Sequence, residues 1–227
     1  MNNIVAFLPI RKGSQRIKNK NTKNFCGIIG GLTHIKISQL LKSNCIKKII
    51  VSTNDNQVKK IARTFKNNKI LIDDRSDELS SSNTSTDSLI EYVSEIISEE
   101  IVLWTHTTSP FIHSKIYDKI IKVYFEKMSH HDSLMTVTKI QKFIWNAKGP
   151  INYNAKLEKW PRTQYLEPLY EVNSGVFLSS IDIYKKNLDR IGKKPFFYEL
   201  NDFEALDIDW NLDFKISEVL WSKYGQI

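Results

Sequence analysis

Residues 4–24 read IVAFLPIRKGSQRIKNKNTKN and carry the strongest signal for the fold in this chain. The first five of these residues form a continuous apolar run that ends at Pro9. Such a run is typical of a strand buried inside a sheet. A long loop rich in Lys and Arg follows directly. Because ligands of open α/β sheets bind at the carboxyl ends of the strands, this loop is the first candidate for a site.

The same order of strand, loop and helix repeats through the first 137 residues. Asp87 is the residue expected to cap the third helix. The alternation predicts a doubly wound, mainly parallel (Rossmann-like) α/β sheet with helices on both faces. Further strands are predicted at residues 49–52, 70–72, 101–104 and 134–137, and helices at 32–41, 58–65, 89–97 and 116–124.

The rest of the chain is less regular. Residues 139–175 combine several prolines and aromatic residues with little periodicity. We expect this segment to be a substrate-binding and dimerisation extension within a single domain of residues 1–227. Order returns with strands predicted at residues 176–178, 196–198 and 206–208 and a closing helix at 212–220.

Composition limits the classes of protein that remain. A chain of 227 residues with 41% apolar residues can build one substantial α/β domain but not two. The formal charge of +8 suits nucleic acid, an anionic membrane or a small polyanionic substrate. The two cysteines lack metal-site spacing, and no stretch is long enough to span a bilayer. We therefore expect a cytoplasmic protein without disulfides or a membrane partner.

The loop after the first strand has the composition of an anion-binding segment. Arg11, Arg16 and Lys20 supply positive charge, and Gly13 and Ser14 let the backbone turn and present N–H groups. A triphosphate needs such charges both to bind and to react. The loop matches neither a Walker loop nor a dinucleotide fingerprint. A solvated basic loop or a nucleic-acid patch is an equally good interpretation of this segment alone.

The segment ALDIDWNLD near the end of the chain places Asp207 and Asp209 two residues apart. In an extended segment both carboxylates point to one face, while Leu206, Ile208 and Trp210 point to the core. Adjacent carboxylates suit Mg²⁺, which typically takes one or two carboxylates together with phosphate oxygens. The alternative is a strand end at which Asp209 caps the closing helix. A basic loop and a carboxylate pair in one domain together indicate nucleotidyl transfer.

Two polar loops are weaker candidates. Residues 74–87 read DRSDELSSSNTSTD, and Arg75 with the hydroxyl-rich run could line a pocket for a base and a ribose. His106 follows the strand at 101–104, where a substrate could lie. An ordinary polar loop and a structural histidine are the alternatives.

The segment WPRTQYLEPLYEVNSG at residues 160–175 is a candidate for the second substrate. Arg162 could pair with a substrate carboxylate through two parallel hydrogen bonds. Asn173 and Gly175 would let a sugar approach the backbone. A dimer interface is an equally good interpretation of the aromatic residues in this segment.

Taken in order, six segments resemble the acylneuraminate cytidylyltransferase family, the CMP-sialic acid synthetases. The resemblance covers nearly the whole chain, and its first and last segments are specific when found together. It implies a doubly wound fold, a homodimer and CTP as co-substrate. The segments are FLPIRKGSQRIKNKN, IIVSTND, DDRSDELSSSNTSTD, THTTSPF, PRTQYLEPLYEVNSG and DIDWNLDF.

The resemblance also implies roles for individual residues. Those for catalysis are Arg11, Lys20 and Asp209. Those for the nucleotide are Arg11, Gly13, Ser14, Arg16, Lys20, Asn21, Arg75, Ser85 and Thr86. Those for the acidic sugar are His106, Thr108, Ser109, Arg162, Gln164, Asn173 and Gly175. Asp207 and Asp209 would hold Mg²⁺ or Mn²⁺.

The chain departs from the family pattern at several positions that bear on the sugar. Many members have Lys at Gln15 and Pro at Lys18, and Gln or Asn is usual at His106. These changes leave the reaction type intact and leave open N-acetylneuraminate, legionaminate and pseudaminate. A 3-deoxy-manno-octulosonate synthetase is an alternative, against which YEVNSG and RTQ argue. A nucleic-acid-binding protein is another, but lysines spread over every predicted helix fit solvated faces better.

Overall fold

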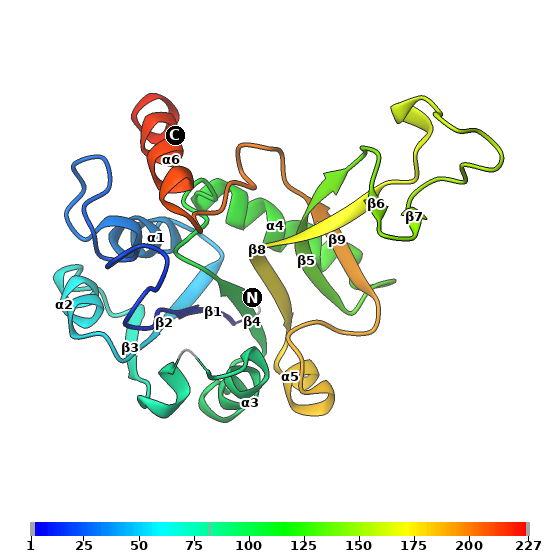
Figure 1. Ribbon diagram of the computed structural model, residues 1–227. Helices are drawn as coiled ribbons and strands as arrows, with labels where there is room; N and C mark the ends of the chain where they lie inside the picture. Colours follow the sequence, from blue (N-terminus) through cyan, green and yellow to red (C-terminus); the bar gives the residue numbers. More distant parts are fainter. Residues whose placement is uncertain (1–2, 82, 226–227) are drawn as a thin grey trace.

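One seven-stranded sheet in the order β3-β2-β1-β4-β8-β5-β9 organises the protein (Figure 1). The computed structural model describes residues 3–81 and 83–225. All neighbouring strands pair in parallel except β8, which runs antiparallel to both β4 and β5. The mainly parallel sheet is therefore confirmed. The strands are β1 Ile4–Pro9, β2 Ile46–Thr53, β3 Ile70–Asp74, β4 Ile101–Thr105, β5 Ser133–Ile140, β8 Leu169–Ser180 and β9 Pro195–Glu199.

Helices cover both faces of the sheet, as the alternating pattern predicts. One face packs against α1 (Gly31–Leu41), α2 (Asn56–Thr64) and α4 (Ser114–Lys127), and the other against α3 (Thr86–Ile96) and α5 (Ile181–Asn187) (Figure 1). The closing helix α6 (Asn211–Tyr224) packs instead on the segment between β1 and α1. Within the described ranges, no helix has the length and apolar character needed to cross a membrane.

The continuous apolar run in β1 follows from this two-sided cover. Ile4, Ala6 and Leu8 pack into the core on the α1 side, while Val5 and Phe7 pack into the core on the α3 side. All five are at most 2% exposed. A strand buried on both faces needs an apolar residue at every position, not only at every second one.

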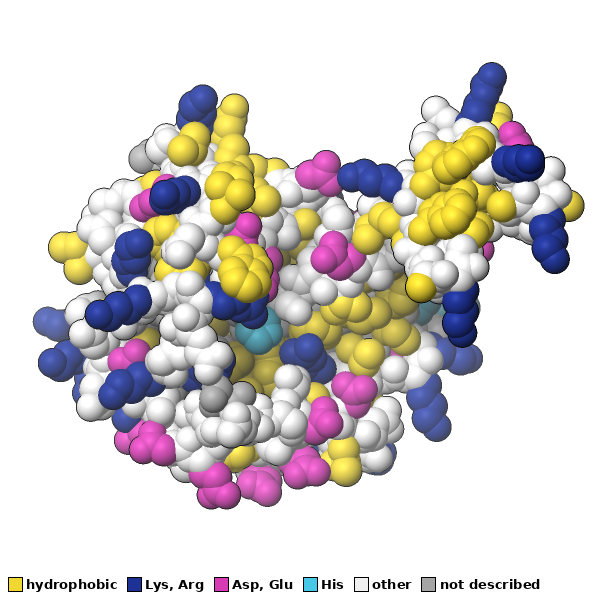
Figure 2. Space-filling model, in the orientation of Figure 1, with side chains coloured by type: hydrophobic (Ala, Val, Ile, Leu, Met, Phe, Trp, Pro, Cys, Tyr) yellow, Lys and Arg dark blue, Asp and Glu magenta, His cyan; other side chains and the backbone are white. Residues whose placement is uncertain are grey.

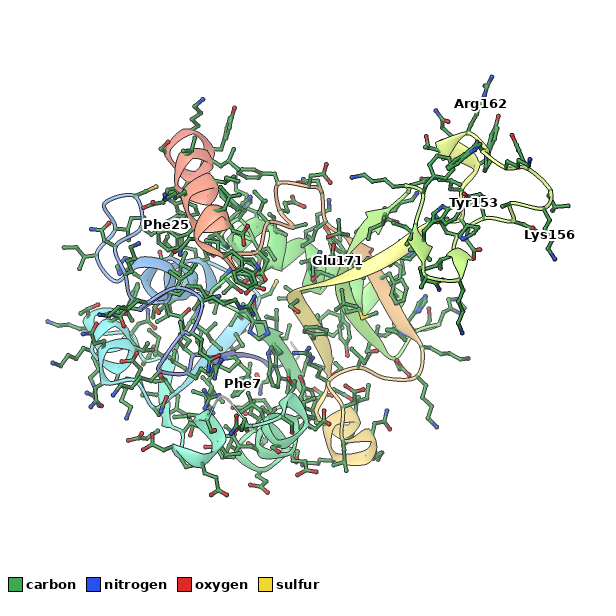
Figure 3. All side chains as sticks on the ribbon, in the orientation of Figure 1. Phe7, Phe25, Tyr153, Lys156, Arg162 and Glu171 are labelled. Atoms are coloured by element: carbon green, nitrogen blue, oxygen red, sulfur yellow. The ribbon has the colours of Figure 1, made fainter. Side chains whose placement is uncertain are left out.

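Residues between β5 and β8 project away from the sheet. They form a two-stranded sheet of β6 (Trp145–Asn146) and β7 (Gly149–Pro150) and the short helix η2 (Thr163–Tyr165). Figure 3 shows Tyr153, Lys156 and Arg162 in this projecting segment, far from Phe7 in the core. Asn152 braces its base by donating hydrogen bonds to the carbonyl oxygens of Lys142 and Glu167.

The strand predicted at residues 206–208 is wrong. These residues are extended, but they form no ladder with another strand. Their backbone bonds go to loops instead: the N–H of Ile208 donates to the carbonyl of Thr108, and its carbonyl accepts from Lys20. Ile208 is buried as expected, whereas Trp210 is 61% exposed and does not point to the core. The alternating pattern therefore predicts the buried position of Ile208 correctly but not the position of Trp210.

One predicted helix cap is wrong, and the alternative role of Asp209 as a helix cap is excluded. Ser85, not Asp87, caps α3, because its hydroxyl accepts a hydrogen bond from the N–H of Ser88. Asp209 does not cap α6, because Trp210 is the residue at the N-cap and the Asp209 carboxylate contacts Arg16 and Lys20 instead. Neither carboxylate oxygen of Asp209 is therefore used for capping.

Candidate active site

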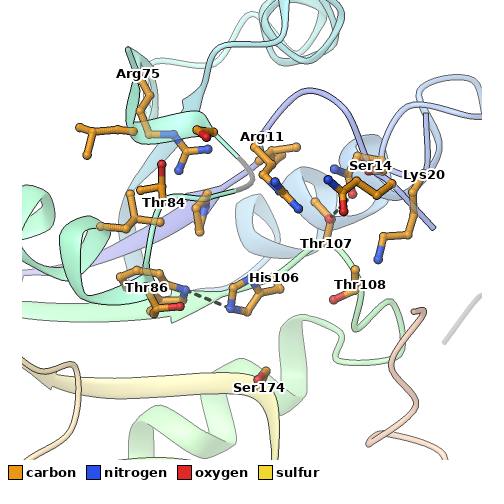
Figure 4. A pocket seen from close by; sticks show the side chains of 18 of the residues that line it. Arg11, Ser14, Lys20, Arg75, Thr84, Thr86, His106, Thr107, Thr108 and Ser174 are labelled. Carbon is orange, nitrogen blue, oxygen red and sulfur yellow. Dashed lines mark hydrogen bonds between the residues drawn. The ribbon is translucent and has the colours of Figure 1, made fainter. Parts of the chain in front are cut away.

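A cavity of about 490 Å³ lies at the carboxyl ends of the strands, where β1 and β4 end (Figure 4). Figure 2 shows the molecule hollowed near the middle of this face, with Lys and Arg side chains next to a histidine. No Asp or Glu of the described ranges lines the cavity. Such a cavity favours an anionic ligand. Its five cationic side chains are Arg11, Arg16, Lys20, Arg75 and Arg190.

The basic loop after β1 is held at both ends. At its start, the N–H of Lys12 donates to the Asn54 side chain at 2.9 Å. At its end, the carbonyl of Asn21 accepts the N–H and the hydroxyl of Thr33 on α1, both at 2.9 Å. The Asn21 side chain accepts the hydroxyl of Thr107 from the loop after β4 at 2.8 Å. The loop is thus fixed against the cavity.

Gly31 is the residue that lets the loop end rest on the start of α1. Its φ of +50° lies in the left-handed region, which favours glycine. A Cβ at this position would overlap the carbonyl oxygen of Lys23. The contact between the end of the basic loop and the start of α1 therefore requires glycine at position 31, both for the backbone angle and for the lack of a side chain.

The carboxylate pair lies beside the basic loop. Asp209 pairs with Arg16 at 2.8 Å and with Lys20 at 3.4 Å. Lys20 also donates to the carbonyl of Ile208 at 2.8 Å. Arg16 and Lys20 therefore connect the cavity to the carboxylates, which line a second cavity of about 480 Å³. Ser174 lines both cavities.

Asp207 provides the test of whether the pair suits a metal. Its Oδ1 atom is buried and has no hydrogen-bond partner in the described chain. Burial raises the pKa of Asp207, and the charge of Asp209 adds to this effect. A nearby cation would relieve both penalties. The described residues contain no cluster of three His, Cys, Asp or Glu side chains. A metal ion at this pair would therefore have two protein carboxylates as ligands and would take further oxygen ligands from the phosphates. Such an all-oxygen set of ligands suits Mg²⁺.

The loop between β3 and α3 forms another side of the cavity. Arg75 is only 3% exposed, and its Nε donates to the hydroxyl of Ser80 at 3.0 Å. Figure 4 shows Arg75, Thr84 and Thr86 on the side of the cavity opposite Lys20. Ser85 also lines the cavity, although its hydroxyl caps α3. This side offers mainly hydroxyl groups and one cation.

His106 lies at the end of β4 and is held as a neutral ring. Trp104 donates its indole N–H to Nε2 of His106 at 3.1 Å, so the ring proton of neutral His106 lies on Nδ1. Burial, with the charges of Arg190, Lys36 and Lys20, lowers the pKa of His106 to about 3. His106 therefore presents a neutral N–H donor rather than a titrating acid.

We expect this depressed pKa to make the protein less stable in mild acid. Between the unfolded value of 6.5 and the folded value of about 3, only the unfolded chain binds the proton at His106. The free energy of unfolding should fall as pH falls through this window, by about 1–2 kcal/mol at about pH 5. Urea unfolding at about pH 7.5 and pH 5 should show a smaller fall in His106→Gln than in wild type. The exposed His130→Gln is the control, and equal falls in all three proteins would contradict the expectation.

A fully buried lysine supports the loop after β4. The ammonium of Lys36, on α1, donates to the carbonyls of Ser109 at 2.8 Å and Ile112 at 3.3 Å and to the hydroxyl of Tyr117 at 2.8 Å. Burial holds the pKa of Lys36 well below its ordinary value. Its three protons thus have three acceptors, which is the condition for burying such a group.

The cavity collects most of the residues predicted for the nucleotide and part of those predicted for the sugar. Gly13, with φ of +80°, shapes the basic loop without lining the cavity. The predicted residues that line it are Arg11, Ser14, Arg16, Lys20, Asn21, Arg75, Ser85, Thr86, His106 and Thr108.

Three residues predicted for the sugar have internal partners instead. The Asn173 side chain lines the second cavity and bonds to Thr136, Thr138 and the N–H of Gly175. Gly175 is buried, and a Cβ there would lie 2.6 Å from Ile112. Ser109 is 2% exposed and lines neither cavity. Asn173 and Gly175 shape β8, and the carbonyl of Ser109 accepts a hydrogen bond from Lys36.

Arg162 and Gln164 lie in the projecting segment and not at the cavity. Figure 3 shows Arg162 at the upper edge of that segment, away from the sheet. Within one chain the structure therefore does not bring Arg162 together with the nucleotide loop.

Sequence reasoning missed several residues that line the cavity. Trp104 reads as an ordinary core residue of a buried strand. Ser174 has φ of +56°, an unusual value for a residue with a side chain. Arg190 is a single arginine in a polar connection after α5. None of these three carries a local pattern that separates it from its neighbours.

A doubly wound α/β sheet with a cation-lined cavity at its strand ends is typical of nucleotide-binding enzymes. The family model described as "Cytidylyltransferase" matches residues 5–187. The chain belongs to the cytidylyltransferase family.

Curated relatives of this chain include enzymes that are named for acidic sugars. The chain is 25% identical to the N-acylneuraminate cytidylyltransferase of Escherichia coli over 227 residues, covering 97% of this chain and 52% of the relative. It is 27% identical to the CMP-N,N'-diacetyllegionaminic acid synthase of Legionella pneumophila, covering 96% of this chain and 95% of that one. The chain thus spans about half the length of the first relative and nearly all of the second.

Solved structures agree on the fold. A CMP:2-keto-3-deoxy-manno-octonic acid synthetase complexed with CTP has a TM-score of 0.67 at 14% identity, covering 98% of this chain and 99% of that one. The 4-diphosphocytidyl-2C-methyl-D-erythritol synthase of Anaerococcus prevotii has a TM-score of 0.70 at 14% identity, covering 98% and 97%.

Proposed function

We propose that the protein is a cytidylyltransferase that joins CMP from CTP to a sialic-acid-like nonulosonic acid and releases pyrophosphate. One observation carries the proposal: a cavity lined by five cations lies directly beside the Asp207–Asp209 pair, connected to it by Arg16 and Lys20. The named relatives that act on N-acylneuraminate and diacetyllegionaminate support an acidic nine-carbon sugar as the acceptor.

The reaction needs mainly positioning and charge stabilisation. The anomeric hydroxyl of the sugar forms a bond to the α-phosphorus, the bond from that phosphorus to the pyrophosphate oxygen breaks, and the hydroxyl proton leaves to solvent. Arg11, Arg16 and Lys20 would hold the triphosphate and stabilise charge on the departing pyrophosphate. Arg75 with Ser85 and Thr86 would hold the base and the ribose.

Asp207 and Asp209 are the residues that would hold Mg²⁺ or Mn²⁺. A bound metal ion would neutralise charge on the phosphate oxygens. Arg16 and Lys20 keep the Asp209 carboxylate oriented beside the phosphate end of the cavity. They therefore act on the nucleotide and on the carboxylate at once.

A pyrophosphate-release assay with CTP and Mg²⁺ tests the function. N-Acetylneuraminic, legionaminic, pseudaminic and 3-deoxy-manno-octulosonic acids are offered side by side. Release with one of the three nonulosonic acids is the expected result. Release only with the octulosonic acid would support the alternative sugar class, and no release with any acid would refute the proposal.

We further propose that residues 139–175 are a substrate-binding and dimerisation extension, which Arg162 and Gln164 use to reach the partner's cavity. Two features support this. The extension exposes large apolar side chains, which favours burial against another protein. Arg162 lies far from its own cavity (Figure 3). The exposed side chains are Trp145 at 54%, Leu157 at 86%, Trp160 at 69% and Tyr165 at 75%.

Mixed dimers test this arrangement. Arg162→Ala and Asp209→Ala should each be nearly inactive as pure dimers. If Arg162 acts in the partner's site, a mixed dimer of the two variants keeps one intact site. Unfolding and refolding the variants together in equal amounts should then restore about a quarter of wild-type activity. No recovery, with mixed dimers shown to form, would place Arg162 in its own chain's site or outside both.

A further inference from the structure

Arg190 is a cation that the proposed reaction leaves without a role. It lies in the connection between α5 and β9, and its backbone is fixed on both sides. Its N–H donates to the carboxylate of Asp189 at 2.6 Å, and its carbonyl accepts the hydroxyl of Ser179 at 3.0 Å. Its guanidinium lies 3.6 Å from the ring centre of Phe177 and 5.1 Å from that of Trp104. The side chain is thus stacked in one position at the wall of the cavity.

The guanidinium of Arg190 forms no ion pair with any of the described residues. Of the five cations in the cavity, Arg16 and Lys20 pair with Asp209 and Arg75 donates to Ser80, whereas the side chains of Arg11 and Arg190 have no hydrogen-bond or ion-pair partner within the described ranges. Within residues 3–81 and 83–225 the guanidinium of Arg190 takes part in no ion pair and no hydrogen bond, and the two hydrogen bonds of Arg190 are made by its backbone. A half-buried guanidinium that faces a cavity without a counter-charge favours an anionic ligand there.

The position of Arg190 separates it from the phosphate loop. The order of strands runs from β3, which precedes Arg75, through β1, which precedes Arg11, to β4 and β8. Arg190 lies at the β8 end of this series, since it stacks on Phe177 of β8 and Trp104 of β4. The triphosphate would lie along the β1 loop, so Arg190 is left for a second anion.

His106 adds a second hydrogen-bond donor to the surroundings of Arg190. Trp104 packs under the Arg190 guanidinium and donates its N–H to His106, so one indole positions both groups. His106 is neutral and has its free proton on Nδ1, as described above. A neutral donor beside a guanidinium matches a group that only accepts hydrogen bonds, such as a carboxylate.

We propose that Arg190 is a substrate-binding residue that takes the carboxylate of the acidic sugar, with His106 beside it as a second donor. This assignment rests on the proposed function and adds a specificity-determining contact from the same chain as the nucleotide loop. Acidic sugars would then be selected over neutral ones by Arg190, whereas Arg162 could at most contribute from a partner subunit.

The test uses steady-state kinetics of Arg190→Met, which keeps an unbranched apolar stem over Phe177 but removes the charge. The KM for the acidic sugar should rise about tenfold or more, while the KM for CTP stays within about twofold. Arg63→Met, on the exposed side of α2, is the control for losing an arginine. Arg190→Lys should give an intermediate KM because an ammonium lacks the planar fork.

A second substrate separates binding from structural damage. The same sugar with its carboxylate converted to an amide should react about tenfold or more less efficiently with wild type. Arg190→Met should discriminate between acid and amide by less than about threefold. If Arg190→Met does not fold, Arg190→Lys must show reduced discrimination between acid and amide.

The outcomes distinguish this assignment from the proposed function. Wild type that releases no pyrophosphate with any acidic sugar would overturn both. Active wild type together with Arg190 variants that discriminate fully, or that lose only CTP affinity, would overturn the role of Arg190 alone.

Discussion

Asp209→Ala should lower the turnover of CTP and acidic sugar by at least about a thousandfold. The loss removes one of two carboxylates proposed to hold the metal and, at the same time, the anchor of Arg16 and Lys20. Stability should change by less than about 1 kcal/mol, because Asp209 and Arg16 form a partly exposed ion pair. Pyrophosphate release, urea unfolding and circular dichroism measure these effects.

The control is Asp182→Asn, which removes a carboxylate from the exposed pair with Lys186 on α5. This variant should keep wild-type activity. Asp209→Ala with more than about a tenth of wild-type activity would contradict the metal assignment. A large loss of stability in Asp209→Ala would instead show that the carboxylate is structural.

Gly31→Ala should be the most destabilising substitution at a glycine near the site. The new Cβ would overlap the carbonyl oxygen of Lys23, and the left-handed φ of +50° is already unfavourable for alanine. We expect a loss of about 3 kcal/mol or more in the free energy of unfolding. Because Lys23 ends the basic loop, the KM for CTP should rise as well.

Gly27→Ala is the matched control for the backbone angle alone. Gly27 has φ of +79°, and a Cβ there would meet nothing within 4 Å. Its loss of stability should be about 1 kcal/mol. Equal losses of the free energy of unfolding in the two variants would show that a small shift relieves the contact with Lys23. The end of the basic loop would then not be held rigidly against α1.

The sheet could be predicted from sequence because its strands are buried on both faces. Continuous apolar runs such as residues 4–8 leave few alternatives to a central strand. Residues 206–208 show the limit of the same reasoning. Their alternation resembles a strand, but their backbone bonds to Lys20 and Thr108 depend on distant loops. A period of two in the sequence does not reveal whether a neighbouring strand is present.

Some residues of the candidate site could be predicted from the sequence and others could not. Residues on loops that directly follow parallel strands, such as Arg11 and His106, meet because topology places those loops at one edge. Arg190 reaches the same cavity from a connection after α5, because β8 runs antiparallel between β4 and β5. Arg162 fails to reach it because the extension turns away from the sheet. The sequence around Arg190 and around Arg162 contains no pattern that would predict which of the two reaches the cavity.

The buried Lys36 has a consequence for how the site responds to its ligands. Its ammonium ties two carbonyls of the loop that carries His106, Thr107 and Thr108 to Tyr117, whose hydroxyl also bonds to Thr105. That loop is therefore ordered when the chain folds. The conformational entropy of fixing it belongs to the folding reaction and is absent from the free energy of substrate binding. On this side of the cavity the protein is preorganised, so ligand binding there should proceed without a slow ordering step.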